Sequence, residues 1–483
     1  MVAESKKVSR RRFLLYTAVG AILIGAAAGT YYLTSKPTVT STPTTTSTLT
    51  SSPSPTITTP TTQTSTTTSP ITTITSTRPT GKITTLLHKA PWLEAYKKII
   101  EQYKNVSGNE VVLETVAGIP DLRDKYIADA TQGTALYDIY TLVPVIALSL
   151  IPNQLYPIEK IHPSYKPDPN IIQHPYGFYK GSNYLFPLNN NPEIIFYRKD
   201  LFDEVGLKPP VTWDDVVEAA KTLHNPSKEI YGFIPRGSAD PITEYTMLRS
   251  FGGDWFVDWE NGDFTVRVND ANGLAAFETL ALLAKYSPPS PNTISQTDIG
   301  NYMMSGKGAQ TLVVAALATS MDDPKLSKVP NLIDYAPPPK GLAPGGMSTA
   351  VDGGFGLGVP LKSKNIPVAV DFAEFCATKE AQYIMAQYGT APCRMDVAQD
   401  PNLLKDPKNR YLKAAAQVIP NQVSWPCLPE QPYIKNTIFA KLVDKVLTGY
   451  PVKQALNECA EEMYKYMKEK GYKTSWTPNL WEK

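Results

Sequence analysis

Residues 82–142 read KITTLLHKAPWLEAYKKIIEQYKNVSGNEVVLETVAGIPDLRDKYIADATQGTALYDIYTL, and the fold class can be inferred from their pattern. Short runs rich in apolar and β-branched residues alternate in it with stretches whose apolar residues repeat at helical spacing. They predict three strands and two helices, in the order Ile83–His88, Trp92–Tyr103, Glu110–Val116, Asp121–Ala130 and Tyr137–Leu142. This strand–helix alternation predicts an α/β protein with a parallel sheet and helices on its faces. Since solutes bind beyond the carboxyl ends of such strands, the loops 88–92 and 142–145 are expected to line a binding site.

Length, charge and residue counts narrow the range of possible functions. The 483 residues exceed one ordinary domain, so two or three units are expected. The 47 basic and 45 acidic residues nearly balance, which argues against a nucleic-acid-binding surface. The four histidines and four cysteines show no metal-ligand spacing, so neither a metal nor another cofactor is expected.

The first 81 residues carry no globular pattern. Within residues 1–33, Arg10-Arg11-Arg12 precedes an uncharged apolar run, which is typical of a twin-arginine export signal, and the run is also long enough for an uncleaved membrane anchor. Residues 34–81 are almost entirely Ser, Thr and Pro, and they predict a disordered stalk because they contain too little apolar surface to offset the entropy of ordering. The protein is therefore expected at the cell surface, held to the outer face of the cytoplasmic membrane.

The rest of the chain predicts further helices. Thr212 is expected to cap one of them, with Asp215 completing a variant of the capping box. The helices are expected at Asp214–Leu223, Pro241–Phe251, Ala271–Lys285, Pro367–Cys376 and Lys379–Tyr388.

Residues 196–223 (FYRKDLFDEVGLKPPVTWDDVVEAAKTL) resemble the signature of family 1 extracellular solute-binding proteins, the sugar-type, maltose-binding-protein-like receptors of ABC importers. Six other pieces resemble tracts of that family in the same order along the chain: Tyr137–Ile158, Leu248–Trp255 (LRSFGGDW), Tyr302–Gln310 (YMMSGKGAQ), Asp334–Gly346 (DYAPPPKGLAPGG), Val351–Gly358 (VDGGFGLG) and Pro392–Arg394. The resemblance spans nearly all of the chain after Gly81, and the stalk is similar to that of archaeal surface receptors.

The resemblance implies a periplasmic-binding-protein-like fold, in which two α/β lobes close on a solute by a hinge motion. Lobe 1 is expected to hold residues 82–188 and 308–360, and lobe 2 residues 189–307 and 361–483. The implied function is that of a monomeric, non-enzymatic receptor that captures a mono- or oligosaccharide and delivers it to the permease of an ABC importer.

A cleft that holds an uncharged sugar needs flat aromatic faces for its C–H groups and amides or carboxylates for its hydroxyls. The candidate ligand-binding residues are Trp92, Asn189, Asn190, Asn191, Asp254, Trp255, Trp259, Phe355 and Arg394. Phe355 follows two glycines and matches the position where members of the family stack an aromatic ring on sugar. Each candidate also has a structural interpretation, as a turn residue for the asparagines, a core side chain for the aromatic residues and a surface ion pair for Arg394.

Two other classes of function compete with the receptor. A surface glycosidase would use a pair of acids such as Asp254 and Asp258, and an adhesion protein would use the stalk alone. The cleft-facing loops show no cluster of Arg or Lys, which favours an uncharged solute. Since an exported protein permits disulfides, Cys393 and Cys427, both in Pro-rich loops, are expected to pair.

Overall fold

A computed structural model describes residues 78–151 and 153–483. The expected export signal and all but the end of the expected stalk lie outside the described residues. The last four residues of that stalk are attached to the domain. Arg78 pairs with Asp371 at 2.9 Å, and the N–H of Gly81 donates to Asn109 at 2.8 Å. Residues 78–81, which the composition assigns to the stalk, are therefore part of the folded domain.

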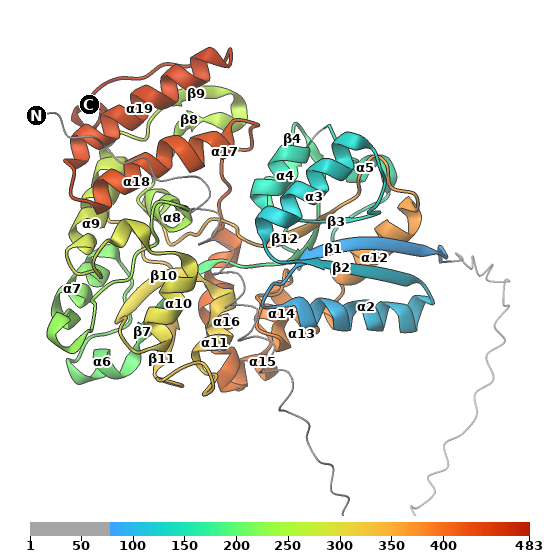
Figure 1. The fold of residues 1–483 in the computed structure, drawn as a ribbon, viewed down its shortest axis with the longest axis horizontal. Helices are drawn as coiled ribbons and strands as arrows, with labels where there is room; N and C mark the ends of the chain where they lie inside the picture. Colours follow the sequence, from blue (N-terminus) through green and yellow to red (C-terminus); the bar gives the residue numbers. More distant parts are fainter. Residues whose placement is uncertain (1–77, 152) are drawn as a thin grey trace, which may run out of the picture. The chain divides into compact units, whose positions relative to one another are not determined.

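The first lobe is built on strands from both halves of the chain (Figure 1). β1 pairs in parallel with β2, and β12 lies between β3 and β6 with antiparallel pairing to both. The elements of this lobe are β1 (Lys82–His88), α2 (Leu93–Ser107), β2 (Glu110–Val116), α3 (Ile119–Gln132), β3 (Tyr140–Leu142), α4 (Pro144–Leu150), α5 (Ile158–Ile161), β4 (Phe178–Tyr179), β5 (Ser182–Asn183), β6 (Phe186–Asn189), β12 (Phe355–Gly358), α12 (Ile366–Cys376) and α13 (Lys379–Gln387). The strand and helix alternation expected for residues 82–142 is confirmed, but only β1 and β2 pair in parallel, because β3 pairs antiparallel with β12 from the second half of the chain.

The first lobe closes around the apolar stripe of α2. Ala95, Tyr96, Ile99 and Tyr103 of this helix are fully buried, and Tyr96 and Tyr103 contact Phe372 of α12. The spacing of these residues keeps them on one helical face, so burying that face fixes α2 against the sheet and α12 against α2.

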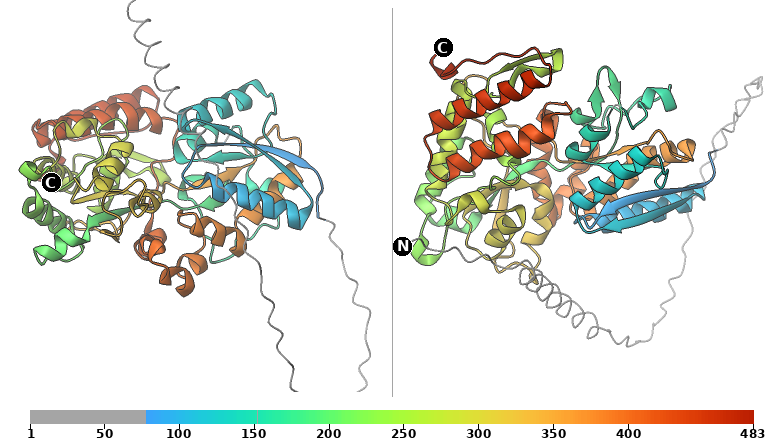
Figure 2. Two further views of the ribbon diagram at one scale, coloured as in Figure 1. Left: turned by 60° about the horizontal axis from the view of Figure 1, so that its bottom comes forward. Right: turned by 45° about the horizontal axis from the view of Figure 1, so that its top comes forward.

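The second lobe has a three-stranded antiparallel sheet in the order β10-β7-β11 (Figures 1 and 2). Helices and one hairpin surround it: β7 (Glu193–Arg198), α6 (Lys199–Glu204), α7 (Trp213–Leu223), α8 (Ile242–Ser250), β8 (Phe256–Asp258), β9 (Asp263–Val266), α9 (Ala271–Ala284), α10 (Gln296–Met304), β10 (Gln310–Val314), α11 (Ala318–Met321), β11 (Ile333–Ala336), α14 (Met395–Ala398), α15 (Pro401–Lys405), α16 (Tyr411–Val418), α17 (Gln431–Tyr433), α18 (Ala440–Leu447) and α19 (Val452–Glu469). A π-helical turn, Ile434–Phe439, joins α17 to α18. All six residues of β7 are buried, because helices cover both faces of this sheet.

The capping box predicted from sequence is present at α7. The Thr212 hydroxyl accepts from the N–H of Asp215 at 3.2 Å, and the Asp215 carboxylate accepts from the N–H of Thr212 at 2.8 Å. The helix then runs from Trp213 to Leu223. This match is local, because a capping box needs only residues three positions apart.

Two segments lie in a different lobe from the one expected. Residues 310–336 were expected in lobe 1, but β10 and β11 pair with β7 on its two sides, with Gln310 opposite Tyr197. Residues 366–387 were expected in lobe 2, but α12 and α13 pack against α2 and share the core of the first lobe. The physical reason is strand pairing. A buried strand needs a hydrogen-bonding partner on each side, and the sequence does not record which distant segment supplies it.

Candidate solute-binding cleft

A cleft of about 400 Å³ is lined by residues of both lobes. Its first-lobe wall is formed where strands end and helices begin. His88 ends β1, Trp92 precedes α2 and Val143 precedes α4, so both loops predicted to line a site do so. This placement follows from the parallel arrangement, which puts the carboxyl ends of strands at one edge.

The first-lobe wall is aromatic. The ring of Phe355 stacks on His88 with centroids 5.5 Å apart and meets the edge of Trp92 at 4.9 Å. Trp92 and Phe355 are 3% and 4% exposed, and burial lowers the pKa of His88, which keeps its imidazole neutral. The three rings therefore form an uncharged aromatic cluster at the cleft.

The second-lobe wall is charged. Arg236 Nη2 donates to Asp240, and the Lys435 ammonium donates to the other oxygen of Asp240 at 2.5 Å. Glu193, at the start of β7, is fully buried, and its Oε1 lies 3.9 Å from Arg236 Nη1. Two cations and two carboxylates thus sit side by side, with no excess of either charge.

The carboxylates of this wall differ in their ionisation. Burial raises the pKa of Glu193, against the opposite effects of Arg236 and the Thr243 hydroxyl. For Asp240, burial also acts to raise the pKa, but the ion pairs with Lys435 and Arg236 outweigh it and lower that pKa. The pKa values of the two carboxyl groups are thus shifted in opposite directions, although both groups lie beside Arg236.

Trp425 adds an aromatic surface to the second-lobe wall. Its ring stacks on Tyr245 with centroids 4.1 Å apart and planes at 11°, and the Lys435 ammonium lies 5.4 Å from its centroid. Sequence reasoning missed Trp425, although Trp425-Pro426 repeats the Trp and Pro pairing of Pro91-Trp92. It also missed Glu193, Arg236, Asp240 and Lys435, and it placed His88 at the site only as the first residue of the loop 88–92.

The sequence shows no cluster of Arg or Lys in the loops expected to face the cleft, yet three basic residues line it. Arg123, Arg236 and Lys435 all line it. Each is paired with an acid, Arg236 and Lys435 with Asp240, and Arg123 with Asp124 at 2.8 Å. The cations come from three segments that lie far apart in sequence, so no local cluster was visible.

The three asparagines of residues 189–191 lie where the chain crosses between the lobes. Asn191 lines the cleft, and its Oδ1 accepts from the N–H of Ala316 at 3.0 Å. The Oδ1 of Asn189 accepts from the N–H of Phe355 at 2.9 Å, and that of Asn190 from the N–H of Asn191 at 3.0 Å. The side-chain oxygens of the three asparagines thus accept hydrogen bonds from backbone N–H groups at the crossing. Nδ2 of Asn189 and of Asn190 is buried with no partner among the described residues.

A second crossing, Asp352–Phe355, packs against the first. A Cβ atom added to Gly354 would lie 2.5 Å from the Asn189 carbonyl oxygen, so only glycine permits this approach. His174 connects the crossing to the first lobe. Its Nδ1 lies 2.6 Å from the Asp352 carboxylate, and its Nε2 donates to the Phe355 carbonyl at 2.8 Å. Asp352 also lines the cleft, so crossing and cleft share a residue.

Three candidates on the segment 254–259 do not line the cleft. Trp255 is fully buried behind Trp425, with ring centroids 5.1 Å apart. Asp254 is buried, accepts from Tyr245 at 2.7 Å and pairs with Arg249. Trp259 is partly buried against the cores of both lobes. The aromatic and acidic cluster is therefore a packing and ion-pair arrangement in the second lobe.

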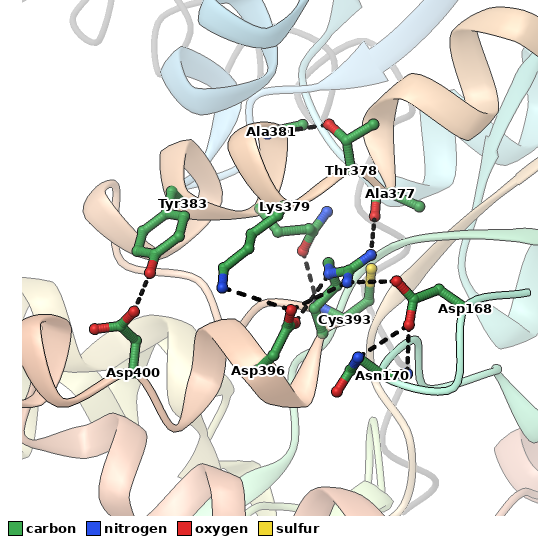
Figure 3. Close-up of polar contacts among 12 residues, drawn as sticks. Asp168, Asn170, Ala377, Thr378, Lys379, Ala381, Tyr383, Cys393, Asp396 and Asp400 are labelled. Carbon is green, nitrogen blue, oxygen red and sulfur yellow. Dashed lines mark hydrogen bonds and ion pairs between the residues drawn. The ribbon is translucent and has the colours of Figure 1, made fainter. Parts of the chain in front are cut away.

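Arg394 also lies outside the cleft lining. Its guanidinium donates to Asp396 at 2.9 Å, to Asp168 at 2.7 Å and to the Ala377 carbonyl at 3.3 Å. Figure 3 shows these three partners, Asp168, Ala377 and Asp396, close to one another. The backbone N–H of Asn170 and then Arg394 lower the pKa of Asp168 to about 2. Arg394 is therefore held by ion pairs, as its structural interpretation predicts.

The expected disulfide is not formed. All four cysteines are buried free thiols. The Cys427 thiol lies 3.5 Å from the Ser424 hydroxyl, whereas Cys393 is buried near Cys376. Burial raises the pKa of Cys393 to about 12 and that of Cys427 to about 11, which keeps both protonated. Among residues 78–151 and 153–483, no group of acidic, histidine and cysteine side chains is arranged to hold a metal ion.

Known proteins resemble the chain in sequence and fold. It is 26% identical to the mannitol-binding protein of Pseudomonas aeruginosa over 61% of this chain and 71% of that protein, and 22% identical to a probable amino-acid ABC transporter periplasmic-binding protein of Sinorhizobium fredii over 77% and 84%. The fold matches a solute-binding protein of Agrobacterium radiobacter solved with ribitol, with a TM-score of 0.67, 23% identity and coverage of 80% of this chain and 98% of that one. The family model for bacterial extracellular solute-binding proteins matches residues 89–383, more than half of the chain. The chain therefore belongs to the bacterial extracellular solute-binding protein family.

Proposed function

We propose that the protein captures an uncharged sugar or sugar alcohol in its cleft and delivers it to an ABC importer. The observation that carries this proposal is the pairing of two unlike walls. The aromatic surface of Trp92 and Phe355 lies on one side, and the charge-balanced group of Glu193, Arg236, Asp240 and Lys435 lies on the other. Sugars present C–H faces to aromatic rings and hydroxyls to charged hydrogen-bonding groups, so both walls find complementary surfaces on such a solute.

The size of the cleft supports a small solute. Small-molecule sites typically measure about 300–1,000 Å³. The cleft, at about 400 Å³, is near the lower end of that range. This favours a sugar alcohol, a monosaccharide or a disaccharide over a longer oligosaccharide. The mannitol-binding relative and the ribitol complex are consistent with that class.

We infer that the protein releases its solute unchanged. Asp254 and Asp258, the acids that a glycosidase reading would use, are both absent from the cleft lining; Asp254 is engaged by Tyr245 and Arg249, and Asp258 caps the turn at Trp259–Asn261. A general acid must reach the scissile bond, and neither of these carboxyl groups lines the cleft.

The expected location belongs to the same proposal. Residues 1–33 would export the protein and keep it, as a monomer, at the outer face of the membrane beside its permease. Among the described residues, no helix combines the length and apolar character needed to cross a bilayer. Sequencing the N-terminus of the mature protein decides whether the segment is cleaved, because a retained anchor leaves residue 1 or 2 in place.

A ligand panel tests the function. Thermal unfolding is measured with D-mannitol, ribitol, D-tagatose, maltose, glutamate and sn-glycerol 3-phosphate. A solute at one hundred times its Kd adds about 2.7 kcal/mol to the free energy of unfolding. We expect at least one of the uncharged sugars or sugar alcohols to stabilise the protein and to be recovered unaltered. Stabilisation by glutamate alone, or by no compound, would contradict the proposal.

A further inference from the structure

We propose that Arg236 and Glu193 hold one hydroxyl group of the solute between them and thereby select an uncharged polyol over an anionic analogue. This inference rests on the proposed function and identifies the residues that set its specificity. It starts from polar atoms that are buried at the cleft and lack a partner among the described residues.

Arg236 presents two N–H groups in a fixed orientation. The residue is 4% exposed, and one end of its guanidinium is bound to Asp240, which Lys435 in turn holds from the other side. Nε and Nη1 of Arg236 are buried without a hydrogen-bond partner among residues 78–151 and 153–483. Because the guanidinium is planar and anchored, these donors cannot turn away to find water.

Glu193 presents an acceptor beside those donors. Its Oε1 accepts from the Thr243 hydroxyl at 2.6 Å, while its Oε2 is buried and unpartnered in the described part of the chain. The 3.9 Å between Arg236 Nη1 and Glu193 Oε1 exceeds a hydrogen bond. Leaving buried polar groups unsatisfied costs free energy, so a solute group that satisfies both residues gains more here than it would at a hydrated surface.

A hydroxyl is the group that fits this pair. It accepts a hydrogen bond from Arg236 and donates one to Glu193, whereas a carboxylate or phosphate oxygen only accepts and an ammonium only donates. The positive charges of Arg236 and Lys435 are already balanced by Asp240 and Glu193, so an anion meets two carboxylates along with the guanidinium. The anion therefore loses the advantage that an uncompensated arginine would give it.

Glu244, behind this wall, does not change the balance. Its carboxyl group is fully buried, and both of its oxygens lack partners among the described residues. Burial and then the nearby Glu193 raise the pKa of Glu244 well above its ordinary value, which favours the uncharged acid. Besides Glu244, the charged groups facing Glu193 are Arg236 and Asp240.

Calorimetric titration of the wild-type protein, Glu193→Gln, Arg236→Lys and Arg236→Met tests the proposal. The probes are D-mannitol, ribitol, D-tagatose, maltose and sn-glycerol 3-phosphate. One uncharged probe is expected to bind the wild type. We expect each variant to lower the affinity for that probe by about tenfold or more, because it loses one charge-assisted hydrogen bond. Glu193→Gln, which is nearly isosteric, should also reduce the preference for that probe over sn-glycerol 3-phosphate by about tenfold, because it removes one negative charge. Glu218→Gln, an exposed acid on α7 of the same lobe, is the matched control and should bind like the wild type.

A double variant separates the pair from two independent contacts. If one hydroxyl is shared, Glu193→Gln with Arg236→Met should cost clearly less than the product of the two single effects. Single variants that bind like the wild type, or a wild type that prefers sn-glycerol 3-phosphate, would overturn the hydroxyl selection while leaving a solute-binding function intact. Failure of the wild type to bind any uncharged probe would instead overturn the proposed function. Far-ultraviolet circular dichroism confirms that each variant is folded, and the nearly isosteric Glu193→Gln keeps the test decisive if an Arg236 variant is not.

Discussion

Two tryptophans selected from the same sequence lie in different environments. Trp92 follows a proline in a loop after β1 and contributes its ring to the cleft, whereas Trp259 begins a turn after β8 and packs between the two cores. Both positions satisfied the same local criterion of an aromatic residue in a loop. The difference comes from the strand that precedes each loop, because β1 belongs to the parallel pair whose carboxyl end faces the cleft.

This contrast gives a direct test of the aromatic wall. Trp92→Ala should weaken the binding of the solute found in the ligand panel by about 1–2 kcal/mol, because the variant loses the stacking and burial of one aromatic face. Trp259→Ala is the control and should leave the binding constant unchanged, although its partly buried ring should lower the melting temperature. Titration calorimetry measures both constants, and equal losses in the two variants would contradict the assignment of the cleft.

Glu244 predicts a pH dependence of stability. Its pKa is raised well above the ordinary value of 4.5, so the folded state keeps a proton that the unfolded chain releases near that pH. The resulting contribution to stability is complete below about pH 4.5 and is lost as the pH rises through the folded pKa. Urea unfolding from about pH 5 to about pH 8 should therefore show a steeper fall in unfolding free energy for the wild type than for Glu244→Gln. Parallel profiles would mean that the carboxyl group ionises normally.

The positions of individual helices were the feature of this protein that the sequence predicted best. The capping box at Thr212 and the helix that follows it need only local hydrogen bonds and a buried apolar stripe, and both are present. The expected boundaries of most other helices fall within two or three residues of those observed, as for α9 and α12. The reason is that capping, periodicity and Pro or Gly breaks act over a few residues.

The cap of α7 is expected to contribute measurably to stability. Thr212→Ala removes the acceptor for the Asp215 N–H and should cost about 1 kcal/mol of unfolding free energy. Asp215→Ala should cost a similar amount. The two changes together should cost less than their sum, because each side chain supports the other. Urea titrations measure the three values, and additive losses would show that the box does not act as a unit.

At the scale of the whole molecule, the chain crosses between its lobes at segments that are tied to one another. Asn190 bridges to Ala391, Phe355 pairs with Asn189, and His174 binds both Asp352 and the Phe355 carbonyl. Such short, connected crossings restrict the relative motion of the lobes to a hinge. A solute that contacts both walls of the cleft should therefore shift the population toward a closed form.

Small-angle scattering tests this motion. The radius of gyration of the protein without its N-terminal 77 residues should fall when the solute from the ligand panel is added in excess. It should not fall for Trp92→Ala at the same solute concentration, where the site is largely empty. Superimposable profiles of the wild type with and without a solute proved to bind would contradict closure.

Local patterns along the chain were enough to predict the α/β class, the positions of most helices, the loops that follow β1 and β3 at the cleft, and a family resemblance that the family model confirms. Tertiary structure decided which lobe holds residues 310–336 and 366–387, which tryptophans reach the cleft, and how Glu193, Arg236, Asp240 and Lys435 meet. The physical reason is one of range. Periodicity and capping arise between residues a few positions apart, whereas a strand's partner and a buried ion pair are chosen by packing between segments separated by tens to hundreds of residues.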